Sequence, residues 1–597
     1  MRKDKREFVN RIASQADEAA RKYNMRDLYS ITNKLVGKKS GTVGKHVKSK
    51  DGNLLVQDQE IEARWVEHLS SVLNQPPPQI EANIPPANER LQINCDPPTE
   101  TEVKNAIKSL KNNKAAGPDN IPGDILKADT DTATRLLHPI IVKIWETEDF
   151  PADWKNSHIT MIPKKGDLTD CNNYRGISLL SAPGKVQNRI ILSRMQQAVD
   201  CKLRNNQAGF RAGRSCTDQI ATLRIILEQC QELNTSLYVN FIDYSKAFDS
   251  VDRSCLWKIM AHYGIPDKLI SLIKKMYSES GGQILLKGRL STFFEIVSGV
   301  RQGCLLSPFL FLLVIDYVMR QSTSLGNTGI QWSLRSQLED LDYADDIGLL
   351  SHTQTQMQLK TDRVVESSAS VGLNLNTAKT KIIKVNTRAN DPIKVQNANI
   401  EEVHEFTYLG SVVAPGGGTE QDVKSRISKA RGAFAMLHKV WRSNKYRLKT
   451  KLQLFNCNVK AVLFYDSETW FLTAKLEKCL QVFVNKCLKR ILQIFWPTLI
   501  SNEELWRRTK QRKVGEEIKM RKFRWLGHTL RKSNEDITKQ SLQWNPQGQR
   551  RRGRPKMTWR RQLNKELRQL NLTYQTAERL AQDRRGWRSL VAGLSSA

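Results

Sequence analysis

The chain has 597 residues, and its 94 basic and 61 acidic side chains leave a formal net charge of +33. This balance predicts a polyanionic partner, and nucleic acid fits best because phosphate neutralisation supplies affinity whatever the sequence. No apolar run is long enough to cross a bilayer, no hydrophobic leader follows Met1, and the ten cysteines form no Cys-x-x-Cys pair. We therefore expect an intracellular protein, nuclear or cytoplasmic, and exclude a membrane protein, a disulfide scaffold and a zinc knuckle.

The first 98 residues are expected to form a helical extension followed by a linker. Ile61–Leu69 has the apolar spacing of an amphipathic helix, and Asp51-Gly52-Asn53 marks a tight turn between short extended segments. Gln75–Pro98 is rich in proline and asparagine, a composition typical of a linker.

A strand, a basic loop and a returning strand are predicted after a helix that starts at Thr99. The strand Ile159–Pro163 runs into the loop, and Asn173–Leu180 returns from it. Lys164 and Arg175 would face each other across this hairpin, where they could hold a triphosphate, the arginine through its fork of donors.

A glycine-punctuated basic loop, Gln207–Ser215, precedes a predicted helix at Thr217–Glu232. The β-branched and aromatic run that follows is a predicted strand, and Asp243 falls at its end. Asp249 and Asp252 lie just before a helix predicted at 253–262, and we interpret both as structural residues of the helix start.

Two adjacent carboxylates are predicted at the tip of a hairpin. Leu341–Leu350 places Asp345 and Asp346 between two apolar segments, which indicates strand, sharp turn and strand. Side-by-side carboxylates repel each other, and a divalent cation with hard oxygen ligands removes the repulsion. A lone pair would indicate only a solvated acidic turn, but Asp243 could join it to clamp two metal ions, Mg²⁺ or Mn²⁺.

These two stretches, with Ser298–Phe311 between them, resemble reverse transcriptases, and more narrowly those of non-LTR (LINE-type) retrotransposons. The motifs stand in the family's order over roughly Glu102 to Val413, and several motifs in order are stronger evidence than one. The resemblance implies an α+β right-hand polymerase, with fingers, a palm built on an antiparallel sheet, and a thumb. It also implies that Asp243, Asp345 and Asp346 are the catalytic and metal-binding acids.

The resemblance assigns further roles by position. Lys164, Arg175, Phe248, Gln302 and Gly303 would bind the incoming dNTP. The Phe248 ring would exclude a ribose 2′-hydroxyl, although a core aromatic explains it too. Gln302 can hydrogen-bond the nucleotide, and Gly303 allows close backbone approach. Lys379 is a candidate proton donor to pyrophosphate. The remaining contacts are predicted for template and primer: Arg211, Arg214, Tyr408, Leu409 and Gly410.

The domain boundaries expected from these patterns are fingers and palm at 99–415, a helical thumb at 416–500 and a basic C-terminal region at 501–597. The densest basic cluster of that region consists of Arg550, Arg551, Arg552, Arg554 and Lys556. It suits minor-groove insertion, plain phosphate contact or a nuclear-import signal about equally. Four tryptophans interleave with the charge, and base stacking and helix packing explain them equally well: Trp525, Trp544, Trp559 and Trp587.

The expected function is RNA-directed DNA polymerisation, with an RNA template, a DNA primer, duplex DNA and dNTPs as partners. Nothing before residue 99 is long enough for an endonuclease domain, so we expect that activity either to come from another chain or to be missing from this fragment. Two alternatives stay open: a catalytically silent transposon-derived protein that only binds nucleic acid, and a group II intron-type maturase. The intact acids disfavour the first, and the lack of paired cysteines disfavours the second.

Overall fold

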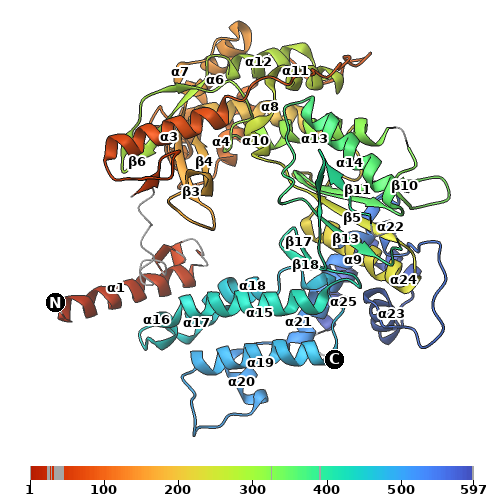
Figure 1. Ribbon diagram of the computed structural model, residues 1–597. Helices are drawn as coiled ribbons and strands as arrows, with labels where there is room; N and C mark the ends of the chain where they lie inside the picture. The colour runs from red at the N-terminus through yellow and green to blue at the C-terminus, as the bar shows by residue number, and fades with distance from the viewer. Residues whose placement is uncertain are drawn as a thin grey trace.

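The computed structural model describes residues 2–22, 24, 27–28, 30–31, 46–324, 326–388 and 391–594. The elements form an open ring, with one group of helices and strands at the top, the main sheet at the right and a row of helices along the bottom (Figure 1). Residues 32–45 of the expected N-terminal extension lie outside the described residues. No helix among the described residues is both long enough and apolar enough to span a membrane.

The upper part of the ring combines a five-stranded sheet with helices. The strand order is β4-β3-β6-β7, and β8 also pairs with β6. Its strands are β3 (Ser157–Pro163), β4 (Tyr174–Leu179), β6 (Gly281–Leu286), β7 (Arg289–Leu290) and β8 (Phe294–Glu295). Its helices are α3 (Asp58–Leu73), α4 (Glu100–Ser109), α5 (Gly123–Ala128), α6 (Thr130–Thr147), α7 (Ala152–Lys155), α8 (Ala182–Asp200), α11 (Arg253–His262) and α12 (Asp267–Tyr277). The predicted start of α4 is confirmed, because Thr99 and Glu102 form a capping box.

The main sheet has the order β11-β12-β5-β13-β16 and is antiparallel except between β13 and β16. Its strands are β5 (Leu237–Ile242), β11 (Asp340–Tyr343), β12 (Asp346–Ser351), β13 (Lys381–Val385) and β16 (Glu401–Glu402). Both faces are covered, because successive side chains of a strand point to opposite sides. Val239 and Phe241 share a core with α9 (Cys216–Glu232), whereas Tyr238 and Ile242 share one with α13 (Ser307–Thr323) and α14 (Gln354–Ala369).

The lower part of the ring is helical, as expected for a thumb. It comprises α15 (Thr419–Met436), α16 (His438–Arg442), α17 (Leu448–Leu454), a π-helical turn (Phe455–Lys460), α18 (Ala461–Leu463), α19 (Ala474–Ile491) and α20 (Asn502–Thr509). The hairpin of β17 (Phe406–Tyr408) and β18 (Ser411–Val413) precedes it. The N-terminal helix α1 (Arg2–Arg21) packs on this part, because Ala16 and Ala20 join its core and Asp17 accepts a hydrogen bond from Thr450.

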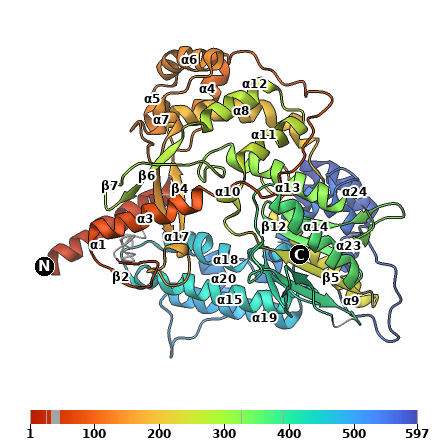
Figure 2. The ribbon, with the colours of Figure 1, turned by 45° about the horizontal axis from the view of Figure 1, so that its top comes forward.

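The C-terminal helices pack against the palm helix α9. They are α21 (Val514–Leu530), α22 (Ile537–Ser541), α23 (Trp559–Gln569), α24 (Tyr574–Gln582) and α25 (Arg584–Gly593). Figure 2 shows α23 and α24 beside the palm. Ala221 and Ile225 of α9 belong to the same core as these helices. The four tryptophans left open above are all buried, so helix packing is the correct explanation: Trp525, Trp544, Trp559 and Trp587.

The remaining short elements are β1 (Val47–Lys48), β2 (Leu54–Leu55), α10 (Ala247–Ser250), β9 (Ile330–Gln331), β10 (Gln337–Leu338), β14 (Lys394–Val395) and β15 (Ala398–Asn399), with 3-10 turns at Cys171–Asn173 and Ser467–Thr469. The turn predicted at Asp51-Gly52-Asn53 joins β1 to β2 and is confirmed.

Candidate active site

Two of the predicted acids meet where the main sheet ends. Asp243 directly follows β5, and Ile242 pairs with Ile347 of β12. The β11–β12 turn therefore lies beside the end of β5, and Asp345 stands in that turn. Asp243 and Asp345 line one cavity of about 770 Å³. The sequence patterns of strand end and hairpin tip predicted this meeting correctly.

The acids are poorly neutralised. Burial and the nearby Asp243 raise the pKa of Asp345, and burial followed by repulsion from Asp345 and Asp243 raises that of Asp346 to about 6. Oδ2 of Asp243 is buried and has no hydrogen-bond partner among the described residues. Its nearest cation is the Lys379 ammonium, 3.5 Å away.

A divalent cation would fit these oxygen donors, since it removes the repulsion that raises the pKa values. Asp243 and Asp345 are the residues placed to hold it. Asp346 follows Asp345 in the chain but does not line the cavity. Within the described ranges, no three His, Cys, Asp or Glu side chains form a complete metal cluster on their own.

Basic side chains also line this cavity. The β3–β4 hairpin pairs Ile162 with Arg175 and brings Lys164 and Arg175 to the end that carries its connecting loop. Both side chains line the cavity, together with Lys246. Burial lowers the pKa of Lys164, and the charge of Arg175 lowers it further. Two cations that share a partly buried space favour an anion with several charges, such as a triphosphate.

The predicted nucleotide contacts Phe248, Gln302 and Gly303 also line this cavity. The Phe248 ring stacks on Phe311 at 4.3 Å between centroids, so α13 supports the ring from one side. Gly303 has a φ of 121°, and a Cβ there would lie 2.4 Å from the Ser178 carbonyl oxygen. Only glycine therefore lets this turn approach β4 so closely.

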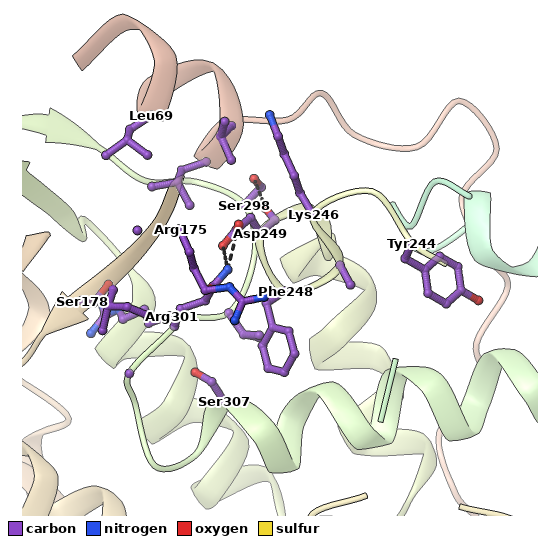
Figure 3. A pocket seen from close by; sticks show the side chains of 18 of the residues that line it. Leu69, Arg175, Ser178, Tyr244, Lys246, Phe248, Asp249, Ser298, Arg301 and Ser307 are labelled. Carbon is purple, nitrogen blue, oxygen red and sulfur yellow. Dashed lines mark hydrogen bonds between the residues drawn. The ribbon is translucent and has the colours of Figure 1, made fainter. Parts of the chain in front are cut away.

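The interpretation of Asp249 as a structural helix-start residue is wrong. Asp252 does cap α11, accepting a hydrogen bond from the Cys255 amide at 2.8 Å. Asp249 instead lines the cavity, and both its carboxylate oxygens accept from the Gln302 amide nitrogen, at 2.8 and 2.9 Å. Figure 3 shows Asp249 with its hydrogen bonds as dashed lines. Burial raises the pKa of Asp249 to about 6.

The helix α3 contributes to the cavity, which the sequence did not reveal. His68 and Leu69 line it, and Figure 3 shows Leu69 projecting from this helix. A Cβ on Gly176 would lie 3.6 Å from the Leu69 side chain, an ordinary packing distance, so α3 lies directly against β4. The amphipathic pattern predicted the helix correctly but gave no signal of where its buried face lies.

The two arginines predicted to contact the template both bind protein groups. Arg211 is buried and binds Asp200 and the carbonyls of Arg204 and Gln207. Arg214 donates to the backbone and side chain of Asn205. Neither arginine lines the cavity, whereas their exposed neighbour Phe210 does.

The predicted primer contacts Tyr408, Leu409 and Gly410 are also held by protein groups. Tyr408 is buried, and its hydroxyl donates to the Leu341 carbonyl, so its side chain supports the palm hairpin. Leu409 and Gly410 form the β17–β18 turn. The thumb holds this turn, because Arg426 donates to the Gly410 carbonyl and Tyr465 to the Leu409 carbonyl.

An antiparallel palm that presents carboxylates to a cavity walled by cations is the arrangement of the right-hand nucleic-acid polymerases. Residues 162–413 match the family described as reverse transcriptase (RNA-dependent DNA polymerase). The chain therefore carries a reverse transcriptase domain, and its homologues are non-LTR retrotransposon polymerases. A domain of unknown function matches residues 433–465.

Curated relatives include the Pol polyprotein of the type-2 retrotransposable element R2DM of Drosophila melanogaster, which is 24% identical over 66% of this chain and 36% of the relative. The RNA-directed DNA polymerase from mobile element jockey of Drosophila funebris is 25% identical over 68% and 45%. The chain thus spans less than half the length of these two relatives. Among solved structures, a Candida tropicalis telomerase in complex with telomeric RNA is 14% identical over 71% of this chain and 72% of that chain, with a TM-score of 0.35.

Proposed function

We propose that this chain is an RNA-directed DNA polymerase of the non-LTR retrotransposon type. The observation that carries the proposal is the shared cavity, which Asp243, Asp345, Lys164, Arg175 and Phe248 all line. The acids suit metal ions, the cations suit a triphosphate, and the ring offers an apolar face to a sugar.

Each side chain then has a defined task. Lys164 and Arg175 bind the triphosphate, and Phe248 packs against the sugar and leaves no room for a 2′-hydroxyl. Gln302 orients the nucleotide, with Asp249 fixing its amide. Two divalent ions held by Asp243 and Asp345, with Asp346 beside them, would activate the primer hydroxyl and neutralise phosphate charge.

In the reaction the primer 3′-oxygen forms a bond to the α-phosphorus and loses its proton to solvent. The bond from that phosphorus to the bridging oxygen breaks, and pyrophosphate leaves. Lys379 lines the same cavity, with its ammonium 3.5 Å from Asp243, and would give the leaving pyrophosphate a proton.

Primer extension on RNA and DNA templates, with dNTPs or rNTPs and with Mg²⁺ or Mn²⁺, tests the proposal. We expect template-dependent incorporation of dNTPs on RNA. A folded protein that binds primer–template but incorporates nothing with either metal would instead be a silent nucleic-acid-binding protein. Activity that requires a particular intron RNA would favour the maturase alternative.

A further inference from the structure

The basic cluster of the C-terminal region lies in a loop that is fixed at both ends. All residues of 547–557 are exposed. On one side, buried Trp544 stacks on Trp332 at 5.2 Å and donates to the Gln331 carbonyl. On the other side, Trp559 is 1% exposed, and its backbone amide donates to the Glu228 carboxylate at 2.8 Å. The palm therefore holds both ends while the basic middle projects from it.

The position of the loop separates it from the catalytic cavity. Arg551 donates to Asn234, and Thr235 donates to the Gln547 carbonyl. Asn234 and Thr235 connect α9 to the start of β5, whereas Asp243 follows the end of β5. A strand rises about 3.3 Å per residue, so the eight residues from Thr235 to Asp243 span roughly 26 Å. The loop thus stands at the far end of the palm.

Among the described residues, the charges of the loop lack carboxylate partners. Within the described ranges, no carboxylate forms an ion pair with any of its five cations: Arg550, Arg551, Arg552, Arg554 and Lys556. By contrast, Arg561, just after the loop, pairs with Glu232 of α9. Five like charges in seven residues repel one another, and a polyanion would relieve that repulsion.

We propose that this loop is a second nucleic-acid site that binds duplex DNA separately from the primer–template in the catalytic cavity. Arginines on an exposed loop can enter the narrow minor groove of B-form DNA and contact the phosphates on both its edges. The minor groove of A-form RNA is wide and shallow and gives such side chains less to enclose. DNA is therefore the better ligand.

The test compares two variants of the full chain that carry the same change in charge. One has the five loop cations replaced by glutamine. The matched control has five exposed arginines of the nearby helices replaced by glutamine: Arg568, Arg579, Arg584, Arg585 and Arg588. Binding of a blunt 30-base-pair DNA duplex is measured over a salt series, with the catalytic cavity saturated by primer–template. An RNA duplex of the same sequence is measured in parallel.

We expect the unaltered protein to bind duplex DNA and primer–template together. The slope of log affinity against log salt concentration should be shallower in the loop variant, by about 0.9 for each phosphate contact removed and by up to about 4.5 in total. The control variant should keep most of the salt slope of the unaltered protein. Equal slopes in the two variants, displacement of the duplex by primer–template, or equally tight RNA binding would each overturn the proposal. None of these measurements needs polymerisation, so a protein without polymerase activity would still test the proposal on the loop.

A different observation leads to a second inference, on Phe210. Its side chain is 49% exposed and its φ is 52°, a left-handed value that bulky residues rarely adopt. Gln207 enforces this geometry, since its side-chain oxygen accepts from the amides of Gly209 and Ala344, both at 2.7 Å. A Cβ on Gly209 would lie 2.3 Å from the Ala344 nitrogen. The ring is thus fixed relative to the turn that carries Asp345.

We infer that Phe210 stacks on the nucleobase of the primer terminus. This rests on the proposed function: the primer 3′-oxygen must lie near Asp345, so the terminal base is the one beside this turn. Every base offers a π-face, and an exposed ring is otherwise left in water. Phe210 would act as a positioning residue through this contact.

The test measures the affinity for primer–template without dNTPs, using primers that are intact or lack the terminal base. Phe210→Ala should weaken binding of the intact primer roughly 5- to 100-fold, and Phe210→Trp should restore it. With the abasic primer, the alanine variant and the unaltered protein should bind alike. Phe293→Ala, at another exposed ring, is the control. The inference would be overturned if Phe210→Ala bound the intact primer as tightly as the unaltered protein, or if it also weakened binding of the abasic primer. Neither measurement needs catalysis.

Discussion

Asp249 and Gln302 face each other in the nucleotide cavity, and both carboxylate oxygens lie within 2.9 Å of the amide nitrogen. The contact uses the side-chain nitrogen of Gln302 and leaves its side-chain oxygen to accept a hydrogen bond from a ligand. Asp249→Asn replaces a carboxylate, which only accepts hydrogen bonds, with an amide that both donates and accepts. The Gln302 side chain is then no longer held in one orientation. We expect the KM for dNTPs to rise about tenfold with kcat little changed. Steady-state kinetics measure this, and Asp249→Asn should have no further effect in a protein that already carries Gln302→Ala.

The same substitution should stabilise the fold. Burial raises the pKa of Asp249 to about 6, so the ionised form costs folding free energy. This cost is full above pH 6 and falls as pH is lowered towards the ordinary carboxyl pKa of about 3.9. The melting temperature of Asp249→Asn should therefore exceed that of the unaltered protein at pH 8, and the difference should shrink at pH 5. A constant difference would mean that ionisation is not its cause.

The sequence predicted that Asp243 and Asp345 meet because local patterns determine their positions. The β-branched and aromatic run of β5 ends just before Asp243, and small and acidic residues mark the turn at Asp345. Asp249 was misinterpreted because an acid before a helix is usually a cap, while Gln302 reaches it only through tertiary folding. Arg211 was predicted to contact the template because the sequence does not reveal its partner Asp200, which lies at the end of the preceding helix.

Asp243→Asn or Asp345→Asn should abolish extension and leave primer–template binding nearly intact. The acids serve metal ions, while affinity comes from dispersed basic side chains. Loss of a metal ligand should slow incorporation by on the order of a thousandfold or more. Extension assays and binding assays on the same preparations measure the two effects. Near-normal extension by either variant would show that the acid is dispensable.

Phe248→Val should raise incorporation of rNTPs relative to dNTPs without abolishing polymerisation. The ring is proposed to exclude a 2′-hydroxyl by steric clash, and a smaller side chain would remove that clash. Phe248→Tyr keeps the ring and its stacking on Phe311, so it is the matched control. The ratio of kcat/KM for each nucleotide pair is the measurement. An active valine variant with unchanged discrimination would make Phe248 a core aromatic only.

Arg224 of α9 and Asp422 of α15 form a buried ion pair, 2.8 Å apart, that joins palm to thumb. Asp422 also accepts from Ser411 and from the Val412 amide, so the pair holds the β17–β18 hairpin. Asp422→Leu alone should cost about 3–5 kcal/mol of unfolding free energy, since it leaves a buried charge. Adding Arg224→Met should recover part of that loss. Denaturant unfolding of both variants measures it, and a double variant less stable than the single one would contradict the argument.

Deletion of residues 541–597 tests whether the C-terminal helices belong to the polymerase core. Trp559 is buried against the palm, and Glu228 of α9 would lose the amide that binds it. Burial already raises the pKa of Glu228 to about 7, so the loss of this partner and of apolar cover should destabilise α9. We expect a lower melting temperature and loss of extension, measured against the glutamine variant of the basic loop, which should keep both. A truncated protein that melts and extends like the full chain would mean that these helices are a separable appendage.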